Sequence, residues 1–206
     1  MKNIAIIGSG NIGSNLGRLF ASEHNVTIGS RTPEQTRAKL PRFSVTDYAQ
    51  AVKTADVVIL AVPFSEVTAV AGKIGGLAGK TVIDVTNPLT TDFMALTIGH
   101  TTSAGEAVQA AFPQAYVVKA FNTVLAQALA KAVSGAKSLP SVLVAGNHAE
   151  ANADVVQLAK DAGFNAFDTG PLTNARYLEP LAELGIQLAY GKGHGGEVGF
   201  TFSAVN

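Results

Sequence analysis

Short runs of apolar residues alternate along the chain with segments whose apolar positions recur every three or four residues. The short runs are mostly continuous, which is typical of strands buried on both faces of a parallel sheet. The longer periodic segments are typical of amphipathic helices. Strands and helices that alternate in this way predict an α/β fold of the Rossmann type, with a doubly wound and mostly parallel sheet. The expected strands are 4–7, 26–29, 56–62, 80–85, 116–121, 141–146 and 164–168, with a weaker one at 43–45.

Residues 171–206 carry a different pattern. A helix with an apolar face over 178–189 is followed by a glycine-rich loop at 191–196, and residues 198–202 alternate like a strand. The segment is too small to bury a core of its own. We therefore expect a main domain over residues 1–170, and over the remainder a small C-terminal cap of helix and strand that covers the main sheet or a partner subunit.

The first apolar run passes directly into Gly8-Ser9-Gly10-Asn11-Ile12-Gly13 and then into a helical pattern. Strand, glycine turn and helix together form the dinucleotide-binding fingerprint. Gly8 allows the tight turn, Gly10 lets the backbone approach a pyrophosphate, and Gly13 lets the helix lie close on the strand. The free N–H groups at the start of the helix would hold the phosphates. The alternative is a turn with a structural role only.

The second strand ends in Ser30-Arg31-Thr32-Pro33, about 20 residues beyond the glycines, where the ribose of a dinucleotide is selected. An NAD protein has an acid here, which would repel the 2′-phosphate of NADP, whereas Arg31 would pair with that phosphate. Ser30 and Thr32 add hydroxyl donors. Thr32 also fits a structural role, as the N-cap of a helix over residues 33–40 with a capping box. The segment favours NADP over NAD.

Ligands of an open α/β sheet bind beyond the carboxyl ends of its strands. Two segments follow buried strands there and would border the nicotinamide, namely Ala61-Val62-Pro63-Phe64 and residues 86–89, which include Asn87 and Pro88. Phe64 would flank a flat ring or belong to the core. Residues 86–102 form a long polar connection, and long loops at this edge are frequently functional.

The strand at 116–121 adds two candidates. Asn122, directly after it, would hydrogen-bond the carboxamide of nicotinamide and orient the ring, or else begin an Asx turn. Lys119 lies inside the strand, where a structural or surface role is expected.

Charge and composition limit the classes of molecule that the chain is expected to bind. The 15 basic residues balance the 15 acidic ones without a basic cluster, which argues against nucleic acid and anionic membranes. The chain has no cysteine, which excludes disulfides, thiolate metal sites and thiol chemistry. The first apolar run is too short for a signal peptide, and no run reaches membrane-spanning length. We expect a soluble, cytoplasmic protein.

The sequence contains no motif that indicates metal binding or acid–base catalysis. The four histidines have no metal-ligand spacing, and no nucleophile motif appears. We expect no metal site and no catalytic side chain, because hydride transfer between two flat rings depends on binding and orientation. His194, in the glycine-rich loop, is the histidine of most interest. The histidines are His24, His100, His148 and His194.

The motifs resemble those of the coenzyme F420-dependent NADP oxidoreductases over essentially the whole chain. The segment 168–176, Asp-Thr-Gly-Pro-Leu-Thr-Asn-Ala-Arg, is the most specific of them. The resemblance implies an NADP-binding Rossmann domain over residues 1–170, a small C-terminal cap, usually a homodimer, and hydride transfer between nicotinamide and a deazaflavin. The other segments that carry it are 7–13, 29–31, 61–64 and 120–123.

The resemblance also implies roles for individual residues. Ser9, Asn11 and Ile12 would line the pyrophosphate, and Ser30 and Arg31 would bind the 2′-phosphate. The nicotinamide would be framed by Ala61, Val62, Pro63, Phe64, Asn122 and the backbone near Ala126.

The chain departs from the family at two positions. Archaeal members have a histidine in place of Asn122 and a further basic residue near Gln35, which is neutral here. The sequence Ala-Phe-Asn-Thr at 120–123 is instead similar to the cytosolic NADPH domain of six-transmembrane metalloreductases, which passes a hydride to a flavin.

These features predict an NADP(H)-dependent oxidoreductase that transfers a hydride to a flavin or to deazaflavin F420. One alternative is an NADP-linked dehydrogenase of a small carbonyl or imine substrate, although relatives with that role append a long helical domain. The other is a non-catalytic NADP-binding sensor.

Overall fold

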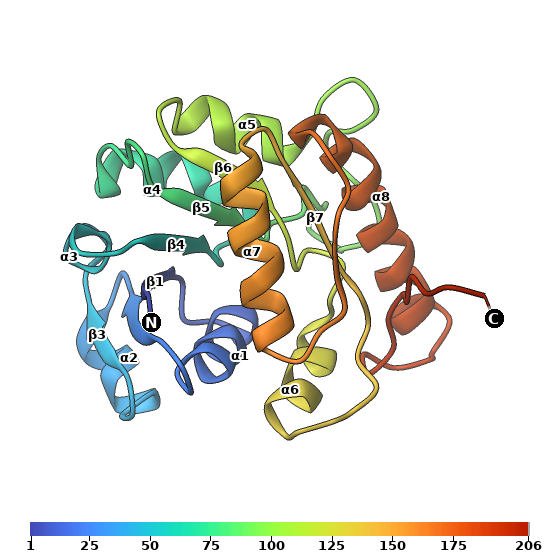
Figure 1. Cartoon of the computed structure of the whole chain (residues 1–206), viewed down its shortest axis with the longest axis horizontal. Coiled ribbons are helices and arrows are strands. Elements are labelled where there is room, and N and C mark those ends of the chain that lie inside the picture. Colours follow the sequence, from blue (N-terminus) through green and yellow to red (C-terminus); the bar gives the residue numbers. More distant parts are fainter. Residues whose placement is uncertain (206) are drawn as a thin grey trace.

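Eight strands form one sheet in the computed structural model, which describes residues 1–205 (Figure 1). The strand order is β3-β2-β1-β4-β5-β6-β7-β8, and every neighbouring pair is parallel except β6 and β7. The predicted doubly wound, mostly parallel sheet is confirmed. The strands are β1 (Asn3–Ile7), β2 (Asn25–Gly29), β3 (Ser44–Thr46), β4 (Val57–Leu60), β5 (Thr81–Asp84), β6 (Tyr116–Lys119), β7 (Val142–Gly146) and β8 (Ala166–Asp168).

Helices cover both faces of the sheet. Successive residues of β1 point to opposite faces, so Ile4 and Ile6 join a core under α1, α6 and α7, whereas Ala5 and Ile7 join a core under α3, α4 and α5. Figure 1 shows α4 and α5 on one side of the strands and α1 and α6 on the other. The helices are α1 (Asn11–Phe20), α2 (Pro33–Lys39), α3 (Tyr48–Lys53), α4 (Val67–Ile74), α5 (Ala104–Ala111), α6 (Ala126–Val133), α7 (Ala149–Asp161) and α8 (Ala175–Ile186).

The order of the strands reverses between β1 and β4. The chain winds from β1 to β3 in one direction and from β4 onward in the other. At such a switch point the loops that leave the two central strands diverge and open a crevice beyond their carboxyl ends. The arrowheads of β4 and β5 point toward the side of the molecule on which α8 lies (Figure 1).

The chain after α8 does not form the predicted strand at 198–202. It lies beside the start of β7, where the Ser141 N–H donates to the Phe200 carbonyl at 2.8 Å and the Phe202 N–H donates to the Ser141 hydroxyl at 2.9 Å. A regular ladder is blocked because Pro140 has no N–H to donate, and its ring packs against Gly199 where a side chain would stand. The alternating pattern therefore produces an extended strap.

Among residues 1–205, no helix is both long and apolar enough to cross a lipid bilayer.

Candidate functional site

The glycine turn after β1 shapes the centre of the crevice. Gly8 has a φ of 114°, and a β-carbon on it would overlap the carbonyl oxygen of Ala61. A β-carbon on Gly13 would overlap the carbonyl oxygen of Gly8. A β-carbon on Gly10, in contrast, would have no heavy atom within 4 Å among the described residues. Gly8 and Gly13 are therefore required by packing, while Gly10 borders open space, as an approaching pyrophosphate requires. No side chain within residues 1–205 caps the start of α1, which leaves its N–H groups free for an anion.

One end of the crevice is a cleft of about 280 Å³ beside the Ser30–Thr32 segment. The Ser30 and Thr36 hydroxyl oxygens lie 2.7 Å apart, and the Ser9 hydroxyl lies 3.4 Å from that of Thr36. Ser30 and Thr36 are both buried. These hydroxyl contacts therefore hold the Ser30–Thr32 segment close to the glycine turn. The lining residues are Gly8, Ser9, Gly10, Ser30, Arg31, Thr32, Tyr48, Ala61, Val62, Pro63 and Glu66.

Thr32 lines this cleft and occupies the predicted N-cap position of α2, directly before Pro33. Its side chain makes no capping hydrogen bond, and its backbone N–H donates to the Ser30 hydroxyl at 3.1 Å. The local loop geometry is thus governed by Ser30 and not by a capping box. The predicted start of the helix is therefore confirmed, while the side-chain capping predicted for Thr32 does not occur.

Arg31 is the only cation that lines this cleft within the described part of the chain. Its side chain is 64% exposed, and its Nη1 lies 3.3 Å from the Oε2 of Glu66. Exposed ion pairs of this kind contribute little free energy, so the guanidinium is free to exchange Glu66 for a phosphate. Burial raises the pKa of the neighbouring Tyr48 hydroxyl above its usual value, although the charge of Arg31 opposes this shift. The raised pKa keeps the hydroxyl protonated.

The other end of the crevice is a cleft of about 410 Å³ that starts at the glycine turn and reaches the loop after β5. It shares Gly10 and residues 61–63 with the first end, so the two form one continuous crevice. None of the described residues that line this end is titratable. They are Gly10, Asn11, Ile12, Ala61, Val62, Pro63, Phe64, Ser65, Val85, Thr86, Asn87, Leu89, Phe93 and Ala126.

Asn122 stands behind this wall and not in its surface. Its Nδ2 donates to the Oδ1 of Asn87 at 3.0 Å and to the carbonyl of Leu178 at 3.0 Å. Asn87 Nδ2 in turn donates to the Asn122 carbonyl at 2.9 Å. The Oδ1 of Asn122 is buried without a partner among the described residues. Asn122 therefore reaches across to the neighbouring loop and to α8, and the alternative of an Asx turn does not occur.

Pro88 was also predicted to border the nicotinamide. Pro88 is buried and does not line the crevice, but its carbonyl accepts hydrogen bonds from Thr97 and so closes the loop on itself.

The sequence reasoning missed Thr36, Tyr48, Glu66 and Phe93. Phe93 carried a detectable signal, because an aromatic residue within a polar loop is unusual; it is 61% exposed and has a φ of 61°.

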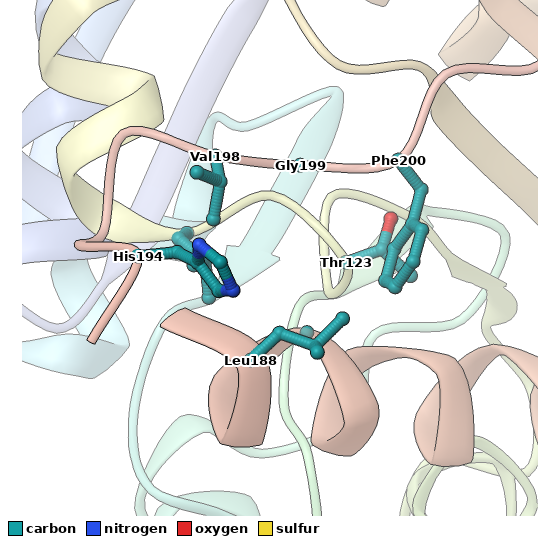
Figure 2. A pocket seen from close by; sticks show the side chains of 8 residues that line it. Thr123, Leu188, His194, Val198, Gly199 and Phe200 are labelled. Carbon is teal, nitrogen blue, oxygen red and sulfur yellow. The ribbon is translucent and has the colours of Figure 1, made fainter. Parts of the chain in front are cut away.

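His194 borders a different cavity, of about 200 Å³, under the strap. Figure 2 shows His194 of the glycine-rich loop and Val198 and Phe200 of the strap facing Leu188, which follows α8. The lining of the cavity is mainly apolar and includes Thr123 and Leu125, and it shares no lining residue with the crevice. Within residues 1–205, no group of three or more possible metal ligands comes together. Neither observation gives His194 a role in the crevice.

Lys119 is fully buried, so of the two roles expected for it, structural or surface, the surface role is excluded. Its ammonium lies 2.6 Å from an Asp84 carboxylate oxygen and 2.8 Å from one of Glu179. The sequence pattern around Lys119 did not indicate this ion cluster, because the two carboxylates come from other elements, β5 and α8.

A protein family described as coenzyme F420-dependent NADP oxidoreductases matches residues 3–88 of the chain. Among solved structures, the chain is similar to an F420-dependent NADP-reductase, described as putative, from Arthrobacter sp. FB24, with a TM-score of 0.88 and 30% identity over 99% of this chain and 100% of that one. A reductive aminase from Aspergillus terreus, solved with NADPH and ethyl levulinate, shares the fold at a TM-score of 0.65 and 16% identity, covering 94% of this chain and 63% of that one.

Curated relatives include the rat (Rattus norvegicus) metalloreductase STEAP3, which is 33% identical over 86% of this chain and 36% of its own length. The human metalloreductase STEAP2 is 29% identical over 86% of this chain and 35% of its own length. The chain thus spans about a third of the length of these relatives.

Proposed function

We propose that this chain, which belongs to the family of coenzyme F420-dependent NADP oxidoreductases, transfers a hydride between the nicotinamide of NADP(H) and the ring of a flavin or deazaflavin. The chain is an NADP-dependent oxidoreductase, and the acceptor is the part that we propose. The observation that carries this choice is that no titratable residue of the described chain lines the nicotinamide end. Reduction of a carbonyl or imine requires a proton donor at the product, whereas ring-to-ring hydride transfer requires orientation.

The placement of the cofactor follows the two ends of the crevice. Arg31 and the hydroxyls around Ser30 suit the 2′-phosphate, because a guanidinium offers several donors to phosphate oxygens. The open space at Gly10 and the uncapped start of α1 suit the pyrophosphate. Residues 61–64, together with Asn87 and Ala126, would then frame the nicotinamide.

The acceptor would stack on the outer face of the nicotinamide. Phe93 and Leu89 line the crevice beyond Asn87, and Phe64 lines it from the β4 side. Apolar and aromatic side chains of this kind suit a flat, mainly apolar ring. A sensor that only binds NADP would have no need of a lined space beyond the nicotinamide.

We also propose a homodimer. The outward side of α8 carries Tyr177 and Leu184, which are 75% and 48% exposed. Their spacing of seven residues places them along one side of the helix, which suits packing against a second copy. Sedimentation velocity of the wild type and of a Leu184→Lys variant would test it, since a dimer should dissociate in the variant. The cytoplasmic location and the domain boundary near residue 170 stay predictions.

The acceptor is tested by following NADPH absorbance under anaerobic conditions with FMN, FAD and F420 in turn, and with a small ketone and an imine as competing substrates. We expect oxidation with at least one of the three ring acceptors and none with the ketone or imine. Oxidation only with the ketone or imine would establish the dehydrogenase instead. If NADPH binds but no acceptor oxidises it, the result would favour the non-catalytic NADP-binding sensor.

A matched pair of variants locates the acceptor. Phe93→Asn should raise the KM for the acceptor and leave the affinity for NADPH unchanged, because Phe93 lies at the outer rim and asparagine tolerates its backbone conformation. Phe202→Asn changes an equally exposed phenylalanine on the strap and should leave both constants unchanged. An unaltered KM in Phe93→Asn would remove the acceptor from this rim.

A further inference from the structure

A buried cluster of three charges lies directly behind the nicotinamide end of the crevice. Lys119 of β6, Asp84 of β5 and Glu179 of α8 each have a side chain at most 1% exposed. Two carboxylates thus surround one ammonium. The excess negative charge faces the start of α5, where Glu179 accepts hydrogen bonds from the Ala104 and Gly105 N–H groups at 2.8 and 3.0 Å. The positive end of the helix dipole favours that arrangement.

The cluster holds both backbone groups of Thr86. The Thr86 N–H donates to the Oδ1 of Asp84 at 2.8 Å, and its carbonyl accepts from the Lys119 ammonium at 2.8 Å. The carboxylates meet the ammonium at ion-pair distance, whereas the bond to Thr86 has the directed geometry of a hydrogen bond. Thr86 lines the crevice, and the next residue, Asn87, makes the reciprocal pair with Asn122.

Packing fixes the lysine stem as well as its charge. A β-carbon on Gly105 would stand 3.2 Å from the Cε of Lys119 and 3.1 Å from the Cβ of Ala175. The start of α5, the start of α8 and the stem therefore meet with no space for a methyl group. The position of the ammonium, and through it that of Thr86, depends on how α8 is seated.

Stability alone is a weak reason for such a cluster. Burying charges costs desolvation, and replacing a buried ion cluster with apolar residues of similar volume is often neutral or stabilising. What the ammonium adds is direction, because it fixes one carbonyl relative to two carboxylates on different elements.

We propose that Lys119 is a positioning residue, which holds Thr86 at the place that the nicotinamide ring requires and makes that place depend on α8. This inference rests on the proposed function, because that function assigns the nicotinamide to this end of the crevice. Lys119 itself lines neither end of the crevice.

The test compares two ligands that differ only in the nicotinamide, namely NADPH and 2′-phospho-ADP-ribose. The main variant is the neutral triple Asp84→Asn, Lys119→Met and Glu179→Gln. The amide oxygen introduced by Asp84→Asn can still accept from the Thr86 N–H, whereas Glu179→Gln leaves one acceptor oxygen for the Ala104 and Gly105 N–H groups. The Thr86 carbonyl therefore loses its partner, together with one N–H at the start of α5. We expect NADPH to bind about fivefold more weakly, as the loss of one hydrogen bond would produce, while the fragment binds as in the wild type. With an active acceptor, kcat should fall as well.

Arg176→Gln is the matched control. Arg176 also ties α8 to α5, through bonds of 2.9 and 2.6 Å to the Glu106 carboxylate, but its side chain makes no hydrogen bond with Thr86 among the described residues. This variant should lower the melting temperature and leave both affinities unchanged. A nicotinamide-specific loss in Arg176→Gln equal to that in the triple variant would overturn the inference, because general seating of α8 would then explain it.

Each remaining outcome is decisive. Equal weakening of both ligands, or of neither, in a triple variant with native circular dichroism would overturn the role of Lys119. If the triple variant does not fold, Gly105→Ala displaces the Lys119 stem without changing a charge and should give the same ligand-specific loss in part, and no such loss would overturn the role. Binding that follows the expectation while no acceptor is reduced would refute the proposed function and leave the positioning role supported.

Discussion

The two ends of the crevice are built in different ways. At the adenosine end, the groups proposed to hold the phosphates come from the glycine turn at 8–13 and the segment 30–32, each of which follows its strand directly, while Tyr48, residues 61–63 and Glu66 complete the lining. The nicotinamide end combines residues 61–64, 86–93 and 126, and it is supported by α8. Under the proposed placement of the cofactor, local motifs would therefore select NADP(H), while tertiary contacts would place the reacting ring.

The largest effect is expected at the glycine turn that the two ends share. Gly13→Ala should lower the free energy of unfolding by about 3 kcal/mol and abolish NADPH binding, because the new methyl group overlaps a backbone carbonyl that cannot turn away. Gly10→Ala should leave stability unchanged, since no heavy atom of the described chain lies within 4 Å, and should still weaken NADPH binding by filling the pyrophosphate space. Urea denaturation and fluorescence titration measure the two effects. Normal NADPH binding by Gly10→Ala would place the pyrophosphate elsewhere.

Arg31→Ala should affect only the adenosine end. Loss of a charge-assisted pair with the 2′-phosphate should cost about 1.5–3 kcal/mol in NADPH binding and nothing in NADH binding. Glu66→Gln is the opposite control, because it frees Arg31 from its ion pair and should strengthen NADPH binding slightly. Isothermal titration with both cofactors checks the pair. An equal loss for NADPH and NADH would refute the role of Arg31.

Asn87→Ala should affect only the nicotinamide end. It removes both hydrogen bonds of the Asn87–Asn122 pair, so kcat should fall about fivefold while the affinity for 2′-phospho-ADP-ribose stays that of the wild type. Steady-state kinetics and fragment titration separate the two constants. A loss of fragment affinity would show that the two ends are not independent.

The smallest effect concerns the seating of α8 and depends on pH. The hydrogen bond from Arg176 holds the pKa of the Glu106 carboxyl below its usual range. Because the folded pKa lies below the unfolded one, this pair stabilises the fold at pH values above the ordinary carboxyl pKa, about 4.3, and that contribution disappears as the pH falls through the folded pKa. The melting temperature of Arg176→Gln should therefore lie below that of the wild type at neutral pH and converge with it in acid. A difference independent of pH would contradict this account.

The sequence predicted the features that depend on neighbouring residues. The buried strands, the mostly parallel doubly wound sheet that they form, and the packing roles of Gly8 and Gly13 all appear as the apolar runs and glycines indicated. Single segments carry enough information for such elements, because a buried parallel strand needs a continuous apolar run and a tight turn needs glycine.

Features that depend on distant partners were not predictable. The burial of Lys119 requires carboxylates from β5 and α8, and the place of Asn122 requires Asn87 and the carbonyl of Leu178. The strap at 198–202 failed to become a strand because of Pro140, which lies far earlier in the chain. None of these partners is visible from the segment itself.

The most direct test of the central claim is the fate of the hydride itself. NADPH carrying deuterium at C4, prepared separately with the label on each face, is reacted with a deazaflavin, whose C5 keeps a transferred deuterium in a stable carbon–hydrogen bond. Direct transfer from nicotinamide to ring predicts that mass spectrometry finds the label in the reduced deazaflavin from one of the two labelled cofactors only. A reduced deazaflavin without label from either cofactor, or a deazaflavin that stays oxidised while NADPH is bound, would contradict it.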